Sequence, residues 1–470
     1  MRITACLLAT LLVAGCYDSI VLLGGDGEDH ADVRPDVGAD AEAEAEAATE
    51  DGETDCIPPC PAGFACYYGV CVPAGADGDG DGDADGDADA DGDADADDAG
   101  LACEAVLSRP ARVMDNAADA DERPVALRSG SGFVFFGRAP GPVSADGLRF
   151  RRVGLDGVPA LPMRWTLSSV EIGPIHPLIE LPGGSFATAL QVPSGPGMGI
   201  WVKIVPETGT GGEVPLQVPG TGADDAGPTI AFDGSDVVVA WTRTTASIVY
   251  LQAQRCSATT GEALGTAGTV STGSPGTREP RIASGGGRFA VAYIEGTDDN
   301  LFVSLLDDTF AYTTGSELSP PAGESIVGYP ALVWNGTEFG LAWETAGDSG
   351  AQIHFATFRP DEGPVERGPI LTDVALEPTE QGQLALAWGD LTAEWGIAWR
   401  HDRGAGAGIT LARIDATDLR TLEVPVDASP DATTAAHPDL AYNAGYYMVT
   451  WTEAEDDFSP VAVATYGCTP

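Results

Sequence analysis

Apolar and polar residues alternate in the same way several times along the second part of the chain. Each copy begins near a proline, runs through a short apolar strand to an Asp-Gly or Asn-Gly type of turn, and continues as a second apolar strand that ends in an aromatic residue. The clearest copies are residues 228–241, 280–293, 330–343 and 438–451, with a fifth at 384–399 that carries a two-residue insertion and weaker ones starting at 124 and 177. Starts 50 to 54 residues apart predict seven repeating units over residues 101–470.

Each unit contains the signals of four strands. The proline-led pair reads as a hairpin, and third and fourth strands are indicated by residues 248–255 and 353–358 and by residues 369–374 and 421–426. In the second strand large residues alternate with small ones, as in Phe339, Gly340 and Leu341, so both faces are expected to be buried. Radially packed four-stranded blades satisfy this pattern. The sequence therefore predicts an all-β fold, a seven-bladed β-propeller.

The repeated starts resemble the blades of bacterial β-propellers of the TolB-like or a related lipoprotein type. The resemblance concerns the fold and carries no chemistry with it. An array of immunoglobulin-like modules is the alternative, although such modules are normally near ~100 residues.

The two ends of the repeat region indicate how the ring closes. The last unit ends after three strands, and residues 111–116, ahead of the first unit, read as the missing fourth strand. This closure brings Cys103 near Cys468 and predicts a disulfide between them, with Cys256 as a free thiol. Pairing of Cys103 with Cys256 is the alternative.

The chain begins with Met1 and Arg2, followed by an apolar stretch over residues 3–15. This is the charged and apolar pattern of a secretory signal, and it is too short for a membrane span of roughly 20 residues. Residues 12–16, Leu-Val-Ala-Gly-Cys, resemble the lipobox of bacterial lipoproteins. That resemblance implies cleavage before Cys16, a lipid anchor on its thiol, and a location outside the cytoplasm, with Tyr17 favouring the outer membrane. Ordinary secretion is the alternative.

Acidic residues are concentrated between this signal and the repeats. Residues 17–100 hold 26 Asp and Glu against one basic residue, Arg34, which is about half of the net charge of −49. Such a segment repels itself and lacks apolar groups for a core, so a disordered spacer is expected. Nucleic acid and anionic lipid surfaces are disfavoured as partners. The predicted order is a signal (1–15), an acidic tether (16–55), a cysteine-rich module (56–73), an Asp, Gly and Ala linker (74–100) and the propeller (101–470).

Two groups of residues between the signal and the repeats could form disulfides or bind a metal. Cys56, Cys60, Cys66 and Cys71 lie in a Pro- and Gly-rich segment that resembles the small modules of myxobacterial-type lipoprotein tethers. Two disulfides are expected, three connectivities remain open, and a zinc site is the alternative. A second group has the spacing of a calcium loop, with a solvated spacer as the alternative reading. Its members are Asp87, Asp89, Asp91 and Asp98. No other cofactor is indicated.

A search for catalytic motifs finds little. Residues 347–350, Gly-Asp-Ser-Gly, follow Trp343 in an expected turn and lack a matching histidine motif. The five histidines have no metal-binding spacing, and sialidase-type Asp boxes are absent. Aromatic residues that end the second strands are assigned to core packing rather than to sugar stacking. They are Phe136, Trp241, Tyr293, Trp343, Trp399 and Trp451.

Polar residues at one end of the blades form the only candidate binding face. Residues just before the first strands and in the turns after the second strands fall on the same face of a propeller, and solvated loops are the alternative reading. The first set is Arg123, His176, Glu279, Tyr329 and His437, and the second is Arg243, Glu295, Glu344, His401, Asp402, Glu453 and Asp456.

The sequence favours a non-catalytic, membrane-anchored binding scaffold for an unidentified protein or glycan. Two alternatives stay open. One is a propeller hydrolase or lyase whose active residues are scattered over the blades, and the other is a calcium-dependent adhesin.

Overall fold

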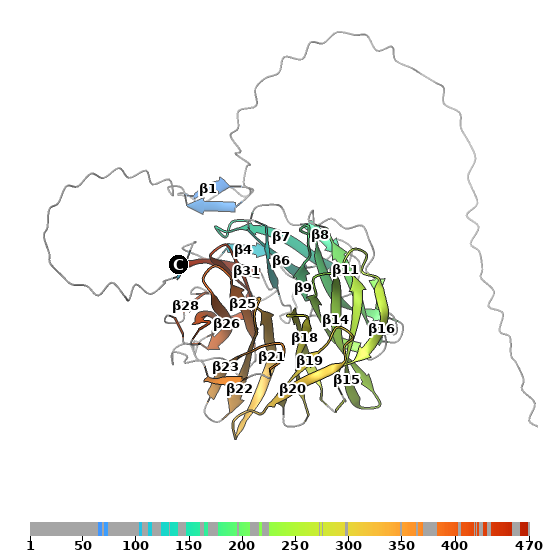
Figure 1. Ribbon diagram of the computed structural model, residues 1–470. Helices are drawn as coiled ribbons and strands as arrows, with labels where there is room; N and C mark the ends of the chain where they lie inside the picture. The colour runs from blue at the N-terminus through green and yellow to red at the C-terminus, as the bar shows by residue number, and fades with distance from the viewer. Residues whose placement is uncertain are drawn as a thin grey trace, which may run out of the picture. The chain divides into compact units, whose positions relative to one another are not determined.

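The computed structural model consists of strands and turns (Figure 1). It describes residues 64–67, 70–73, 103–105, 111–114 and most of 124–468, with its longest later gaps at 140–146, 168–176, 207–215, 370–382 and 454–460. The chain divides into two compact units, Met1–Asp93 and Ala94–Pro470. Within the described ranges no helix is long and apolar enough to cross a membrane.

In the first unit, the described residues form one antiparallel hairpin. It pairs β1 (Phe64–Tyr67) with β2 (Val70–Pro73) and places Cys66 opposite Cys71. Cys56 and Cys60, the acidic tether and the predicted calcium residues Asp87, Asp89, Asp91 and Asp98 lie outside the described residues. Both disulfides of the cysteine-rich module therefore stay predictions.

The second unit contains seven antiparallel sheets, which we call blades 1 to 7 in chain order. Blade 1 is β5 (Val125–Ser129), β6 (Gly132–Ala139), β7 (Gly147–Gly154) and β8 (Arg164–Leu167). Blade 2 is β9 (Leu178–Glu180), β10 (Phe186–Ser194), β11 (Gly197–Val205) and β12 (Leu216–Gln217). Blade 3 is β13 (Asp225–Phe232), β14 (Asp236–Thr245), β15 (Ile248–Ser257) and β16 (Ala263–Thr269). Blade 4 is β17 (Arg278–Gly285), β18 (Arg288–Glu295), β19 (Asn300–Leu306) and β20 (Tyr312–Leu318).

The remaining blades repeat the order. Blade 5 is β21 (Glu324–Trp334), β22 (Phe339–Gly347), β23 (Gly350–Phe358) and β24 (Val365–Pro369). Blade 6 is β25 (Leu384–Gly389), β26 (Glu394–Asp402), β27 (Ala407–Asp415) and β28 (Val426–Asp427). Blade 7 is β29 (Ala435–Asn443), β30 (Tyr446–Glu453) and β31 (Val461–Cys468), completed by β3 (Cys103–Ala105) and β4 (Ala111–Met114).

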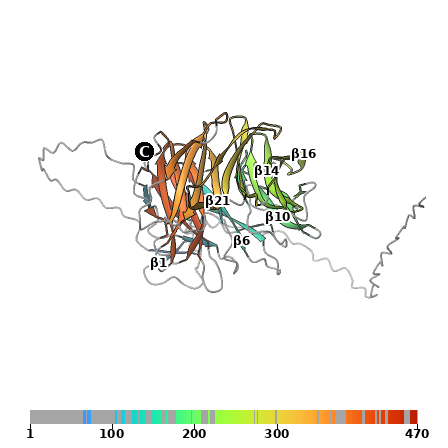
Figure 2. The same ribbon diagram turned by 90° about the horizontal axis from the view of Figure 1, so that it is seen from below.

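The blades follow one another around a central axis (Figures 1 and 2). The first strand of each blade contacts the first strand of the next, and β29 of blade 7 contacts β5 of blade 1, so the ring is closed. The prediction of an all-β propeller is confirmed.

The hairpin turns form as the sequence indicates. In blade 3 the Asp233 carboxylate accepts hydrogen bonds from the backbone N–H groups of Ser235 and Asp236, at 2.9 and 2.8 Å. In blade 5 the Asn335 amide oxygen accepts from Thr337 and Glu338, both at 2.8 Å. These Asx turns fix the register of the first two strands.

Neighbouring blades interlock large side chains over glycines. A Cβ added to Gly340 of blade 5 would lie 2.5 Å from the Trp395 ring of blade 6, and one added to Gly396 would lie 2.3 Å from the Tyr447 ring of blade 7. The small residues of one second strand thus receive the large residues of the next. The six aromatic residues assigned to the core are all buried, so this packing expectation is confirmed.

The last blade takes its outer strands from the start of the unit. Residues Ala111, Arg112 and Met114 of β4 pair with β31. Further along β31, Cys103 of β3 lies directly opposite Cys468. Cys256 is a buried free thiol, and burial raises its pKa to about 12.

A disulfide between Cys103 and Cys468 is expected, because an antiparallel pair of this kind brings two β-carbons within bonding reach. Peptide mapping without reductant should recover the two cysteines in one linked peptide. Recovery of both as free thiols under oxidising conditions would contradict the expectation.

Candidate functional site

A central channel of about 440 Å³ runs between the first strands of all seven blades. Its wall is made of the residues that follow the repeat prolines, and most of them are apolar. Among the described lining residues, Arg281 of blade 4 and Asp439 of blade 7 are the only charged ones. Each directly follows a proline, in Pro280-Arg281 and Pro438-Asp439.

A repeated β-bulge shapes the entrance of this channel. The register shifts at the proline in four first strands, between Ala226 and Thr229, Arg278 and Arg281, Val327 and Ala331, and Ala436 and Asp439. Proline has no N–H to give to the ladder, so a bulge is where it is tolerated.

The residue before the proline has a positive φ in three of these bulges, and in blade 3 it is a glycine, Gly227, with φ 57°. Glu279 has φ 57° and His437 has φ 52°. Residues with side chains rarely adopt this region, and its recurrence in blades 3, 4 and 7 shows that the shared bulge imposes it. We call Glu279, Tyr329, Gln383 and His437 the channel rim.

Asp439 joins the last blade to the first. Its Oδ2 accepts a hydrogen bond of 2.6 Å from the backbone N–H of Ala126. Thr229 has the same place in blade 3, where its hydroxyl accepts from the Ile282 N–H of blade 4 at 3.3 Å. A hydroxyl is therefore enough for this contact between blades, and the carboxyl at position 439 adds an ionisable group.

Desolvation by the surrounding apolar wall raises the pKa of Asp439 from the ordinary 3.8 to about 7, although the residue itself is only half-buried. The N–H groups of Ala126 and Leu440 and the charge of Arg281 act in the opposite direction and lower it in part. Asp439 is thus a carboxyl that exchanges its proton near neutral pH. Such a pKa suits a general acid or base.

Arg281 lies on the other side of the channel, where aromatic stacking positions it. Its guanidinium carbon is 4.7 Å from the centre of the Tyr329 ring, and one of its nitrogens donates to the Pro280 carbonyl at 2.9 Å. A planar guanidinium held in this way suits bidentate recognition of a carboxylate or phosphate.

Four of the residues predicted to form a binding face have structural roles or are buried within the blades. Arg243 forms an ion pair of 2.7 Å with the buried Asp225, which also accepts from the Trp241 indole at 3.0 Å. Glu453 accepts from the Trp451 indole at 3.1 Å.

Two further candidates are buried. Glu344 has 1% of its surface exposed and His401 none. The Nδ1 of His401 lies 2.8 Å from the Thr410 hydroxyl, and its Nε2 lies 3.9 Å from an Asp427 carboxylate oxygen. We expected these two groups in turns at the mouth of the channel, and for both the expectation is wrong. The second strands β22 and β26 extend further than the repeat indicated, so Glu344 and His401 lie within the sheets and are buried.

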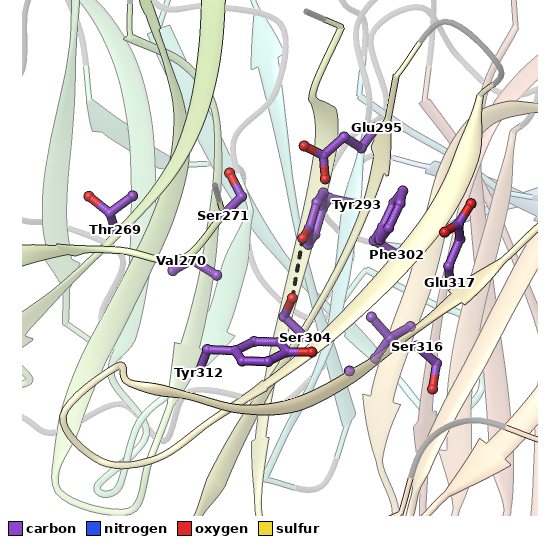
Figure 3. A pocket seen from close by; sticks show the side chains of 12 residues that line it. Thr269, Val270, Ser271, Tyr293, Glu295, Phe302, Ser304, Tyr312, Ser316 and Glu317 are labelled. Atoms are coloured by element: carbon purple, nitrogen blue, oxygen red, sulfur yellow. Dashed lines mark hydrogen bonds between the residues drawn. The ribbon is translucent and has the colours of Figure 1, made fainter. Parts of the chain in front are cut away.

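The other members of the predicted face fall into three groups. Glu279, Tyr329 and His437 belong to the channel rim. Glu295 lies away from it, in a separate hollow of about 580 Å³ between blades 3 and 4 (Figure 3). The structure does not describe Arg123, His176, Asp456 or the side chain of Asp402. Over the described part of the chain, no cluster of His, Cys, Asp and Glu has the geometry of a metal site.

Sequence reasoning missed Arg281 and Asp439 because it considered the residues before the prolines. The repeat itself contained a signal for these two residues, in the position directly after the proline. The residue after the proline is Val, Leu, Thr or Ala in blades 1, 2, 3 and 5, and is charged only in blades 4 and 7.

The chain matches no protein-family profile and no curated protein sequence. Its fold is similar to solved structures at low sequence identity. The polysaccharide lyase Uly1 is 10% identical with a TM-score of 0.45, over 75% of this chain and 92% of that one. The neuraminidase-like protein of a bat influenza A virus, subtype N10, is 10% identical with a TM-score of 0.42, over 63% and 95%. The NanB sialidase of Streptococcus pneumoniae is 10% identical with a TM-score of 0.40, over 76% and 71%.

These similarities concern the fold, which is a β-propeller. The prediction of a non-catalytic scaffold is withdrawn, because propellers of similar fold include a polysaccharide lyase and a sialidase, and the fold itself does not exclude catalysis. That prediction rested on the lack of a catalytic motif, and propeller residues that meet at a channel come from separate blades and leave no motif.

The raised pKa of Asp439 predicts how an Asp439→Asn variant behaves. The folded protein holds this proton more tightly than the unfolded chain does. This difference adds to the free energy of unfolding. The contribution is fully present below about pH 3.8 and is lost as the pH rises through about 7. Asparagine accepts the same hydrogen bond and cannot ionise. The variant should therefore match the parent near pH 4 and melt roughly 1–3 °C higher at pH 8.

Asp307→Asn is the matched control. Hydrogen bonds from Thr309 and Ala311 lower the pKa of Asp307, so this substitution should not stabilise the protein at pH 8. Thermal melts of the three proteins between pH 4 and 8 make the comparison. An Asp439→Asn variant less stable than the parent at pH 8 would contradict the raised pKa.

Proposed function

We propose that the chain is a propeller hydrolase that acts on glycosides carrying a single carboxylate, with Asp439 as the proton-transfer group and Arg281 as the anchor for the substrate's carboxylate. The observation that carries this proposal is the presence of one carboxyl and one guanidinium among the mostly apolar residues that line the channel.

The charge distribution favours a singly charged substrate. Residues 101–470 hold 46 acidic residues against 21 basic ones. A polyanion therefore meets long-range repulsion. A lone carboxylate that enters the channel meets one guanidinium among mostly apolar wall residues, where a bidentate ion pair is stronger than on an open surface. This argument favours a hydrolase over a lyase that acts on an acidic polymer.

The proposed chemistry uses the proton that the Asp439 carboxyl holds and exchanges near neutral pH. With a pKa of about 7, much of this carboxyl is protonated at neutral pH and can give its proton to the oxygen of the leaving group as the glycosidic bond breaks. Water supplies the hydroxyl of the product. The rim adds a second carboxyl, Glu279, and a phenol, Tyr329, in blades 4 and 5 beside the guanidinium, and these are our candidates for the opposing base or nucleophile.

The test is hydrolysis of oligosaccharides that end in sialic acid or a uronic acid, with neutral oligosaccharides for comparison. Asp439→Asn should lower kcat by roughly 10²–10⁴, and Arg281→Met should raise KM roughly 10–100-fold. Arg281→Lys should restore part of the loss. Activity of the parent should fall as the pH rises above about 7, as Asp439 loses its proton.

Two comparisons separate catalysis from folding. An aryl glycoside whose leaving group needs no proton should lose much less activity in Asp439→Asn than a natural glycoside does. Arg278→Met, three residues earlier on β17 and paired with Asp299 at 2.6 Å, should keep the parent KM. Equal losses on both substrates, or turnover that is indifferent to Arg281, would overturn the proposal.

We further propose that the enzyme is a lipoprotein anchored outside the cytoplasm through Cys16, with the outer membrane as its site. The lipobox-like residues 12–16 and the acidic spacer support this. A Cys16→Ser variant should lose the mass of the lipid and leave the membrane fraction. Unchanged mass and fractionation would contradict the anchor.

A further inference from the structure

The hollow between blades 3 and 4 is made by the register of blade 4. Cross-strand pairing places Tyr293, Phe302 and Glu317 in one row across β18, β19 and β20. The next row holds Val291, Ser304 and Gly315, of which the outer two are small. Partners in such rows point to the same face of the sheet, so a row of large side chains borders a row whose outer members are small.

The small outer members of this second row produce the hollow. The small side chain of Ser304 and the bare backbone of Gly315 leave space at the lining of the hollow. Tyr312 closes the far side, and its hydroxyl lies 3.0 Å from where a Gly315 Cβ would stand. The end of blade 3, with Thr269, Val270 and Ser271, forms the opposite wall. Figure 3 shows Phe302 and Tyr312 on two sides of the space around Ser304.

Two aromatic faces are available to a ligand. Phe302 is partly exposed and stacks on Tyr293, with ring centres 5.8 Å apart and planes 19° apart. Tyr312 is 60% exposed, so much of its ring is open to solvent. Exposed aromatic faces beside a hollow provide flat apolar surfaces with polar groups nearby.

Polar groups surround these rings. The Tyr293 hydroxyl shares a hydrogen bond of 3.2 Å with the Ser304 hydroxyl. Glu295 and Glu317 lie at one end of the hollow (Figure 3), and Asn300 donates its amide N–H to Glu317. Carboxylates accept hydrogen bonds from paired hydroxyls, and the hydroxyl groups of the wall both donate and accept.

We propose that this hollow binds a neutral sugar residue, separately from the channel. A pyranose ring has an apolar C–H face for Phe302 and Tyr312 and an edge of hydroxyls for Glu295 and Glu317. The two carboxylates repel an acidic sugar, so this site and the channel select different parts of a glycan. A small apolar ligand would make no use of the carboxylates and hydroxyls that line the hollow.

Binding of neutral oligosaccharides to the full chain tests this proposal. Cellotetraose, mannotetraose and a β-galactotetraose serve as probes in calorimetry and ligand-observed NMR, and at least one of them should bind. Phe302→Ala and Tyr312→Ala should each weaken that binding roughly tenfold, and Glu317→Gln should weaken it as well. Tyr312 is exposed, so its variant keeps the test valid if Phe302→Ala fails to fold.

The controls separate this site from the channel. Leu391→Ala removes a side chain that is 65% exposed and lies outside the hollow, so binding should not change. Asp439→Asn should also bind the neutral sugar as the parent does, whatever its effect on hydrolysis in the channel. The two proposals can therefore fail independently. The proposal is overturned if none of the three neutral probes binds, or if binding survives both aromatic substitutions.

Discussion

The structure depends on closing a ring whose ends are distant in sequence. Blade 7 contributes only three strands of its own, and an unpaired edge on β31 would invite association with other chains. β3 and β4 cover that edge. On the inner side the seam is held by the hydrogen bond from the Ala126 N–H to the Asp439 carboxyl, and on the hairpin side by the Asn443 amide, which donates to the carbonyls of Gly130 and Gly132.

This seam places an ionisable group where the fold needs only an acceptor. Thr229 makes the equivalent contact between blades 3 and 4 with a neutral hydroxyl. Retaining a carboxyl at position 439 costs stability at neutral pH, since the channel disfavours its ionised form. Costs of this kind are typical of sites where function opposes stability.

The strands and turns could be predicted because local patterns determine them. Asp233 and Asn335 form their turns through their own side chains, and the alternation of Phe339, Gly340 and Leu341 matches blades that pack on both faces. The pairing of residues 111–114 with the last blade followed from counting strands. The site could not be predicted in this way. The ends of second strands look exposed in sequence, yet neighbouring strands bury Glu344 and His401, and only the ring brings Arg281 of blade 4 and Asp439 of blade 7 into one channel.

The state of the Asp439 carboxyl decides whether the channel can transfer protons. Carbon-13 NMR of the full chain labelled at the aspartate carboxyl carbons, compared with the Asp439→Asn variant, isolates the signal of this residue. Its titration should have a midpoint near pH 7, and occupation of Arg281 by a bound carboxylate should move that midpoint upward, because the neutralised guanidinium no longer favours the Asp439 anion. A midpoint near the ordinary value for aspartate, unaffected by the bound carboxylate, would contradict the account.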